Sequence, residues 1–287
     1  MRPSRKSTRS CSRQRGAARA RGGYSAIVTL IMVATTLVIT VASTFVSFNV
    51  LEAQSEMAEY ENAKAALTSM AQLIETLSQS EGLAGYSRMY VRSGCLDIGT
   101  GQECFTLRIG GWAALEALPF LTIGFRGGRF IGGPDYSVLR GQQGSYAQDF
   151  LIVPPSTPEI PLGWVYVEQE GGAKTLVDFG RVRISFIGTM NLTTASGGWE
   201  SVNVVEIVFI RLLRGPTYGR EVFDLRAQNK KIVVTTTRLL GTTFEILAVS
   251  GQSSQTYTLV CPSTQNDKPV VGTIFNVVVV DIEVGTQ

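Results

Sequence analysis

A long run without any charged side chain dominates the N-terminal part of the chain. It extends over 28 residues, from Tyr24 to Leu51. As an α-helix it would be roughly 42 Å long, which is enough to cross a bilayer. A secretory signal has an apolar core of only about 7 to 15 residues and ends at a small-residue cleavage site, which does not follow this run. The sequence therefore predicts a membrane span and not a conventional signal peptide.

The segment before this span is strongly basic. Residues 1–23 contain eight of the 26 lysines and arginines and no acidic residue. Arginine clusters beside an apolar span remain on the cytoplasmic side of the membrane. Without this segment the chain has 18 basic and 23 acidic residues, a formal net charge of −5. The basic balance of the whole chain is thus no evidence for a nucleic-acid partner, and none is expected.

The helix is predicted to continue beyond the span. No glycine or proline occurs between Tyr24 and Glu81, whereas Gly82 and Gly85 follow at once. We expect one helix of about 55 residues over 24–81, with residues 24–51 as the apolar half. The second half carries an apolar stripe at alternating spacings of three and four, which would pack on a globular domain. The stripe consists of Tyr60, Ala63, Leu67, Met70, Ile74 and Leu77.

Small hydroxyl residues form a second stripe, within the apolar half. Thr29, Thr36, Thr40, Ser43 and Ser47 are separated by 7, 4, 3 and 4 residues and share one helical face. Such side chains let two helices approach closely and also bond to carbonyls of their own helix. One interpretation is a helix that packs against copies of itself. The alternative is a chance pattern in a threonine-rich helix.

Residues 82–287 show the period of two that is typical of strands. Glycine, proline, asparagine and serine separate the runs, and no second helical period appears. The fold class expected is α+β: a long N-terminal helix followed by an antiparallel, sandwich-like β-domain. The predicted strands are Cys104–Ile109, Phe150–Val153, Trp164–Glu168, Val182–Ile187, Val202–Leu213, Glu221–Arg226, Ile232–Leu239, Phe244–Val249, Thr256–Val260 and Gly272–Val284.

The cysteines predict one disulfide, and the composition argues against most catalytic sites. Cys95 and Cys104 flank a glycine-containing stretch that is read as a hairpin tip. A bond there would add about 2.5 kcal/mol and require an oxidising exterior; two reduced thiols on adjacent strands are the alternative. Cys261 is expected to be a free, buried small residue, and Cys11 lies in the basic segment. The chain has no histidine, which excludes histidine-dependent catalysis, and the cysteine spacing does not suit zinc.

The junction between the basic segment and the span carries a family resemblance. The sequence Ala-Arg-Gly-Gly at residues 20–23 precedes Tyr-Ser-Ala-Ile-Val-Thr-Leu-Ile at residues 24–31. This resembles the class III signal of archaeal type IV pilins and archaellins, and the resemblance covers roughly residues 15–80. It implies removal of the leader by a prepilin peptidase, after Gly23 to leave Tyr24 first, or after Gly22. Bacterial major pilins carry a glutamate at the fifth mature position, where this chain has Val28 or Ile27, which favours the archaeal branch.

The resemblance implies a structural protein without a cofactor. The chain would be a pilin of an extracellular type IV pilus-like filament for adhesion, inserted in the membrane as a precursor. Its partners would be other copies of itself and the pilus assembly machinery, with the helix in the filament core. Three alternatives remain open: a membrane-anchored exterior binding protein that does not polymerise, a minor pilin, and an archaellin.

Two weaker patterns concern modification and catalysis. Asn191 begins the sequon Asn-Leu-Thr, which is compatible with glycosylation of an exterior domain. Scattered carboxylates could supply a pair for glycoside hydrolysis, but isolated acidic residues are usually solvated surface groups, so no enzyme is expected. These carboxylates are Asp135, Asp149, Glu168, Glu170, Asp178 and Glu200.

Overall fold

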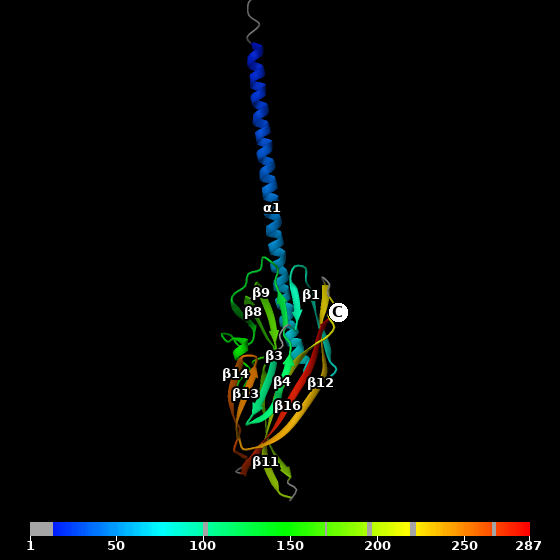
Figure 1. The fold of residues 1–287 in the computed structure, drawn as a ribbon, viewed down its shortest axis with the longest axis vertical. Helices are drawn as coiled ribbons and strands as arrows, with labels where there is room; N and C mark the ends of the chain where they lie inside the picture. The colour runs from blue at the N-terminus through cyan, green and yellow to red at the C-terminus, as the bar shows by residue number, and fades with distance from the viewer. Residues whose placement is uncertain (1–13, 100–102, 170, 194–196, 219–221, 266–267) are drawn as a thin grey trace, which may run out of the picture. The chain divides into compact units, whose positions relative to one another are not determined.

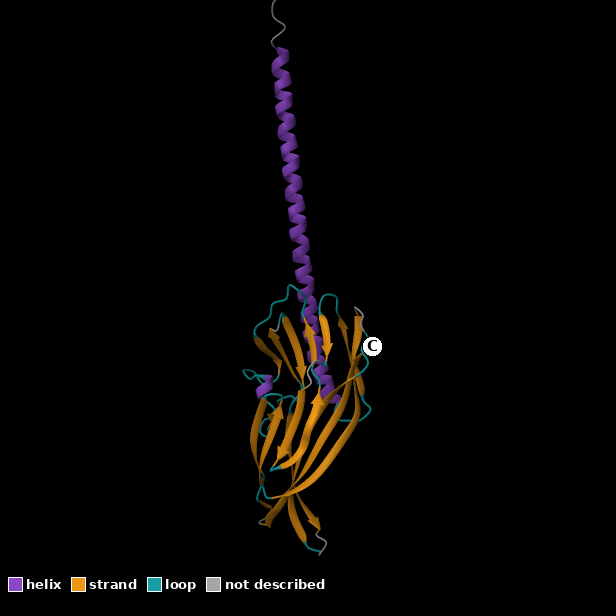
Figure 2. Cartoon of the chain, in the orientation of Figure 1, coloured by secondary structure: helices purple, strands orange, loops and turns teal. Residues whose placement is uncertain are grey.

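The computed structural model describes residues 14–287 apart from 100–102, 170, 194–196, 219–221 and 266–267. The chain divides into two compact units, Met1–Gln54 and Ser55–Gln287. The helix α1 (Gln14–Leu77) contributes to both, and Figure 2 shows it as the one long helix among the described residues. The second unit holds every strand (Figure 1).

Helix α1 begins ten residues earlier than predicted and ends four residues earlier. The extension covers residues rich in alanine and arginine, which are strong helix formers, and it passes through Gly22 and Gly23. At the other end the last turn tightens, because the N–H of Gln79 bonds to Thr76 and not to a carbonyl four residues back.

The largest sheet of the second unit runs in the order β1-β12-β16-β11-β10-β7, with β15 paired to β16. Most pairs are antiparallel, but β11 and β16 are parallel, as are β10 and β7. The bounds of these strands are Ala84–Tyr90 for β1, Val222–Leu240 for β12, Lys268–Thr286 for β16, Trp199–Arg214 for β11, Val182–Thr193 for β10, Ile152–Val153 for β7 and Thr264–Gln265 for β15.

Two smaller sheets complete the domain. One has four strands: β14 (Ser253–Val260), β13 (Thr243–Ser250), β3 (Glu103–Ile109) and β4 (Trp112–Phe120). The other has five strands: β2 (Cys95–Ile98), β5 (Ile123–Arg126), β9 (Ala173–Asp178), β8 (Trp164–Gln169) and β6 (Tyr136–Arg140). A short 3-10 helix spans Ala147–Asp149.

The large sheet buries both of its faces, as its alternating side chains require. On one face, Ile210 and Leu212 of β11 join a core with the last turns of α1 and with the five-stranded sheet. On the other face, Ile207 and Phe209 pack against the four-stranded sheet, where Phe105 stacks on Phe209 at 4.6 Å between ring centroids. The α+β, sandwich-like fold class is therefore confirmed.

The amphipathic stripe of the helix is also confirmed. All six of its predicted residues, from Tyr60 to Leu77, are at most 4% exposed, and Leu67, Met70 and Ile74 are fully buried. The spacing of these residues places all of them on one helical face. The stripe was therefore enough to predict which side of α1 packs on the β-domain.

Some strand predictions were wrong in detail. The two strands expected at 221–226 and 232–239 are one strand, β12, which shifts register against β16 between Asn229 and Lys231. This irregularity interrupts the alternation of side chains and so resembles a strand break. Strand β4 was missed because its sequence, WAALEALPF, is rich in residues that favour helices.

Candidate functional site

The apolar half of α1 is the most conspicuous surface of the first unit. Its large hydrophobic side chains between Ile27 and Leu51 are 45% to 72% exposed. The segment is apolar and long enough to cross a membrane, with a mean hydropathy of 2.3 in its best window and none of that window buried. Exposed apolar surface of this size needs a covering, which lipid or other protein can supply.

The hydroxyl stripe is exposed in this unit, and the hydroxyl groups of three of its residues bond to carbonyls of the helix. Thr36 donates to the carbonyl of Met32 at 2.7 Å, Thr40 to Thr36 at 2.8 Å, and Ser47 to Ser43 at 2.8 Å. These bonds satisfy the hydroxyls internally, so the stripe presents a smooth surface of small groups. Thr29 lies on the same exposed stretch. The residues of the predicted cleavage site, Gly22, Gly23 and Tyr24, lie inside α1.

The disulfide was predicted on the assumption that Cys95 and Cys104 lie on the two strands of one hairpin, and this assumption was wrong. Cys95 is on β2, which pairs with β5, whereas Cys104 is on β3, which pairs with β4 and β13. The two strands therefore belong to different sheets, and both thiols are free and exposed. Cys261 is free and buried, as predicted, and burial raises the pKa of its thiol.

The sequon asparagine lies on a strand and not in a loop. Asn191 is exposed on β10, and its side-chain oxygen accepts a hydrogen bond of 2.8 Å from the hydroxyl of Ser201 on β11. Its amide nitrogen is the atom that glycosylation would use. Glycosylation of Asn191 stays a prediction.

Of the six scattered carboxylates, Asp135, Glu168 and Asp178 line one pocket of about 820 Å³ within the second unit. Three of the six are held in ion pairs: Glu168 with Lys174 at 3.6 Å, Asp178 with Arg181, and Glu200 with Arg238. Glu170 lies outside the described residues. Across the described ranges, no three histidine, cysteine, aspartate or glutamate side chains are placed to hold a metal ion.

Three glutamates attach the second half of α1 to loops of the β-domain. Glu59 accepts hydrogen bonds from the backbone N–H groups of Arg92, Ser93 and Gly94 at 3.0 to 3.1 Å, and from the Ser93 hydroxyl at 2.9 Å. Burial raises the pKa of the Glu59 carboxyl, but the donors lower it by more, so the net pKa lies below the ordinary value. These contacts involve loops that sequence patterns do not place near the helix.

The other two glutamates make similar contacts. Glu56, only 8% exposed, accepts the N–H of Phe130 at 2.8 Å and packs so closely on Gly128 that a Cβ there would lie 2.6 Å from its carboxyl group. Glu75 accepts the N–H of Gly163 at 2.8 Å and pairs with Arg140 at 2.6 Å. The sequence did not predict these contacts, because glutamates on an amphipathic helix normally face water.

A buried asparagine caps the same helix. The side-chain amide of Asn229, on β12, donates to the carbonyls of Leu77 at 2.9 Å and Ser80 at 3.0 Å. The last carbonyls of a helix lack the usual partner four residues on, so the amide supplies a donor to Leu77, and through Ser80 it also holds the turn that follows the helix. The side chain is 1% exposed.

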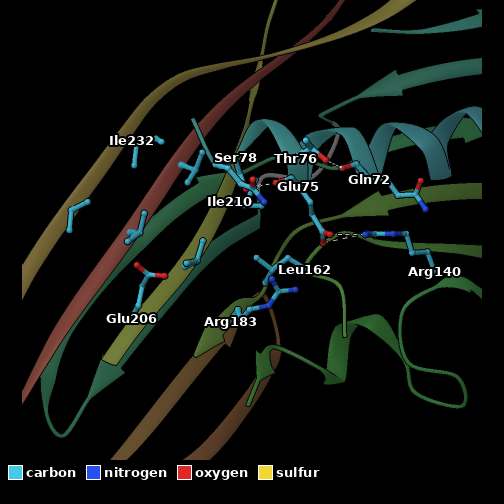
Figure 3. Close-up of a pocket in the computed structure, with 15 residues that line it drawn as sticks. Gln72, Glu75, Thr76, Ser78, Arg140, Leu162, Arg183, Glu206, Ile210 and Ile232 are labelled. Carbon is cyan, nitrogen blue, oxygen red and sulfur yellow. Dashed lines mark hydrogen bonds and ion pairs between the residues drawn. The ribbon is translucent and has the colours of Figure 1, made fainter. Parts of the chain in front are cut away.

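A pocket of about 660 Å³ lies beside the end of α1, within the second unit. Figure 3 shows Gln72, Glu75 and Thr76 of the helix on one side and Arg183, Glu206 and Ile210 of the sheet on the other. The sheet wall adds valines and isoleucines from β11, β12 and β16. This volume is in the range of small-molecule sites.

Comparison of the chain with protein-family models, with curated proteins and with solved structures finds no match.

Proposed function

We propose that this chain is a pilin, a structural subunit of an extracellular archaeal type IV pilus-like filament for adhesion. The apolar helices of many copies would form the filament core, and the β-domains would lie outside it. One observation carries the proposal: large hydrophobic side chains along 27–51 are exposed at 45% to 72%, in a helix whose following turns are built into a globular domain.

The energetics support this arrangement. In the membrane, lipid covers the apolar residues. Once the basic leader is removed, a helix that leaves the bilayer must cover the same surface with other helices, which stabilises a bundle by about 25 cal/mol per Å² relative to water. The partners implied are the prepilin peptidase, the assembly machinery and further copies of the chain, and no cofactor is required.

Processing provides the first test. We expect the exported protein to begin at Tyr24, or at Gly23 as the second choice, because the basic segment ends there and the apolar run begins. Intact-mass and N-terminal peptide mass spectrometry would measure it. An unprocessed Met1, or a start near residue 50, would contradict the proposal.

Assembly provides the second test. Filaments sheared from cells should contain this chain as a repeating subunit, as seen by electron microscopy together with mass spectrometry of the purified filaments. If the chain is abundant at the surface while no filament contains it, the proposal fails.

A second candidate function is a membrane-anchored exterior binding protein that does not polymerise. The pocket beside the end of α1 favours it, because a structural subunit has no need of one. Here the apolar helix would serve as an anchor alone, and the chain would remain in membrane fractions without filaments.

A further inference from the structure

The pocket beside the end of α1 is divided into an apolar part and a polar part. Ile232, Val280 and Ile210 lie side by side across β12, β16 and β11, and the next row contains Val234, Val278 and Val208. Beyond them the row changes to Thr236, Asn276 and Glu206. The apolar rows are thus nearer the helix end, and the polar row is farther along the sheet (Figure 3).

Two side chains of opposite charge, Arg183 and Glu206, lie beside the second apolar row. Arg183 of β10 is the cross-strand neighbour of Val208, and Glu206 is in the adjacent row of the same face. The Arg183 guanidinium donates to the carbonyl of Ile160 at 2.8 Å, while its buried Nε has no hydrogen-bond partner. Within the described part of the chain, Glu206 makes no hydrogen bond or ion pair.

The other charged groups of the pocket neutralise each other. Arg140 pairs with Glu75 at 2.6 Å, and the same guanidinium bonds to the carbonyl of Gly163. Arg183 and Glu206 are therefore the pair of charges left to meet a ligand. A carboxylate in the pocket would meet the positive charge of the Arg183 guanidinium, and a hydrogen bond between two charged groups is stronger than one between neutral groups.

We propose that this pocket binds a small zwitterion with an apolar side group, of which an apolar α-amino acid is the simplest. Its carboxylate accepts from Arg183, its ammonium group donates to Glu206, and its side chain lies over the two rows of valine and isoleucine. An anion alone would be repelled by Glu206, and a cation alone by Arg183. The cavity of about 660 Å³ leaves room for bridging water. The site lies outside the apolar span, so the proposal does not rest on filament formation.

The test uses the full chain in lipid nanodiscs and isothermal titration calorimetry. L-Leucine is expected to bind at least tenfold more tightly than isovalerate, which lacks the ammonium group, and than isoamylamine, which lacks the carboxylate. L-Serine, which lacks the apolar group, should also bind at least tenfold more weakly.

Substitutions test which charged group of the ligand Arg183 and Glu206 each bind. Arg183→Gln and Glu206→Gln should each weaken leucine binding at least tenfold, the loss expected for one charge-assisted hydrogen bond. Glu245→Gln, on the exposed face of β13, is the matched control and should leave binding unchanged. Isovalerate binding should be weakened by Arg183→Gln and strengthened by Glu206→Gln, which removes the repulsion between two negative charges.

Several results would overturn the proposal. These are the absence of leucine binding up to about 10 mM, equal binding of leucine and isovalerate, and equal leucine binding by all three variants. The comparison of ligands on the unaltered chain decides the question even if Arg183→Gln fails to fold. None of these results bears on whether filaments form.

Discussion

At the scale of single residues, Asn229 shows how the end of a helix can depend on a distant strand. Its amide reaches two carbonyls at the end of α1, and the residues involved are 152 and 149 positions away in sequence. The side chain occupies the irregular point of β12, where the register shifts. The irregularity thus allows a polar side chain to enter the core and bond to the helix.

Replacing Asn229 by alanine should destabilise the domain by about 1–3 kcal/mol, because the carbonyls of Leu77 and Ser80 would lose the hydrogen bonds that the buried Asn229 amide donates. Urea unfolding of the full chain in mild detergent, followed by circular dichroism, would measure this. Lys231→Ala, at an exposed position of the same strand, is the control and should change the midpoint little. Equal midpoints for the two variants would contradict the capping role.

The sequence could not have revealed this residue. Its neighbours Gln228 and Lys230 are polar, so Asn229 looked like part of a turn between two strands. The burial of Leu67 and Met70, by contrast, could be predicted, because it follows from the spacing of apolar residues within one helix. Local periodicity carries information about a face, whereas a contact across 152 residues depends on the whole fold.

At the scale of elements, the attachment of α1 combines an apolar stripe with three glutamates that hold backbone N–H groups. The stripe supplies burial, and the glutamates fix the loops at 92–94, 128–130 and 163 against the helix. Carboxylates that accept several N–H bonds are favoured in the ionised form. Glu59 accepts three such bonds, so its part of the attachment should depend on pH.

Glu59 gives the clearest pH dependence. Its folded pKa lies below the ordinary value of 4.5, so its contribution to stability is present above pH 4.5 and is lost as the pH falls through the folded pKa. Glu59→Gln should be less stable than the unaltered chain at pH 7, and the difference should shrink as the pH falls through the folded pKa of Glu59. Urea midpoints measured across this range would show it.

The control is Glu52→Gln, on the same helix but in the first unit, where the side chain is exposed. It should follow the unaltered chain at every pH. A constant difference between Glu59→Gln and the unaltered chain, down to pH 3, would mean that packing and not charge explains the effect.

At this scale, the sequence did not predict which strands pair with each other. Cys95 and Cys104 are nine positions apart, and a hairpin was the natural expectation for strands so close. Strand β2 instead pairs with β5, and β3 pairs with β4 and also with β13, which lies far along the chain. The alternation predicted that strands exist, but it contains no information on their partners.

At the scale of the whole molecule, the central question is whether the hydroxyl stripe serves assembly. Thr36→Leu and Ser43→Leu should leave membrane insertion intact, because leucine is more favourable in lipid than threonine or serine. In a filament core the added volume should cost about 1–3 kcal/mol per site, and every subunit repeats it. We expect filaments to be lost or fragile while the precursor accumulates in the membrane.

Thr35→Leu is the matched control, since Thr35 is also exposed and also bonds to a carbonyl of the preceding turn but points about 100° away from Thr36. Filament counts by electron microscopy and membrane fractionation would be compared for all variants. Normal filaments from the double variant would mean that the stripe is accidental.

The parallel pairing of β11 with β16 has a consequence for how the protein is made. β16 is the last strand of the domain to be synthesised, yet it lies in the interior of the large sheet, between β11 and β12. Until it arrives, those two long strands have open edges that can pair with any other chain. The large sheet can therefore close only after β16 has been synthesised. Completion of the fold thus depends on synthesis of the chain through β16, and a chain interrupted before β16 would be a target for proteases rather than a shortened protein.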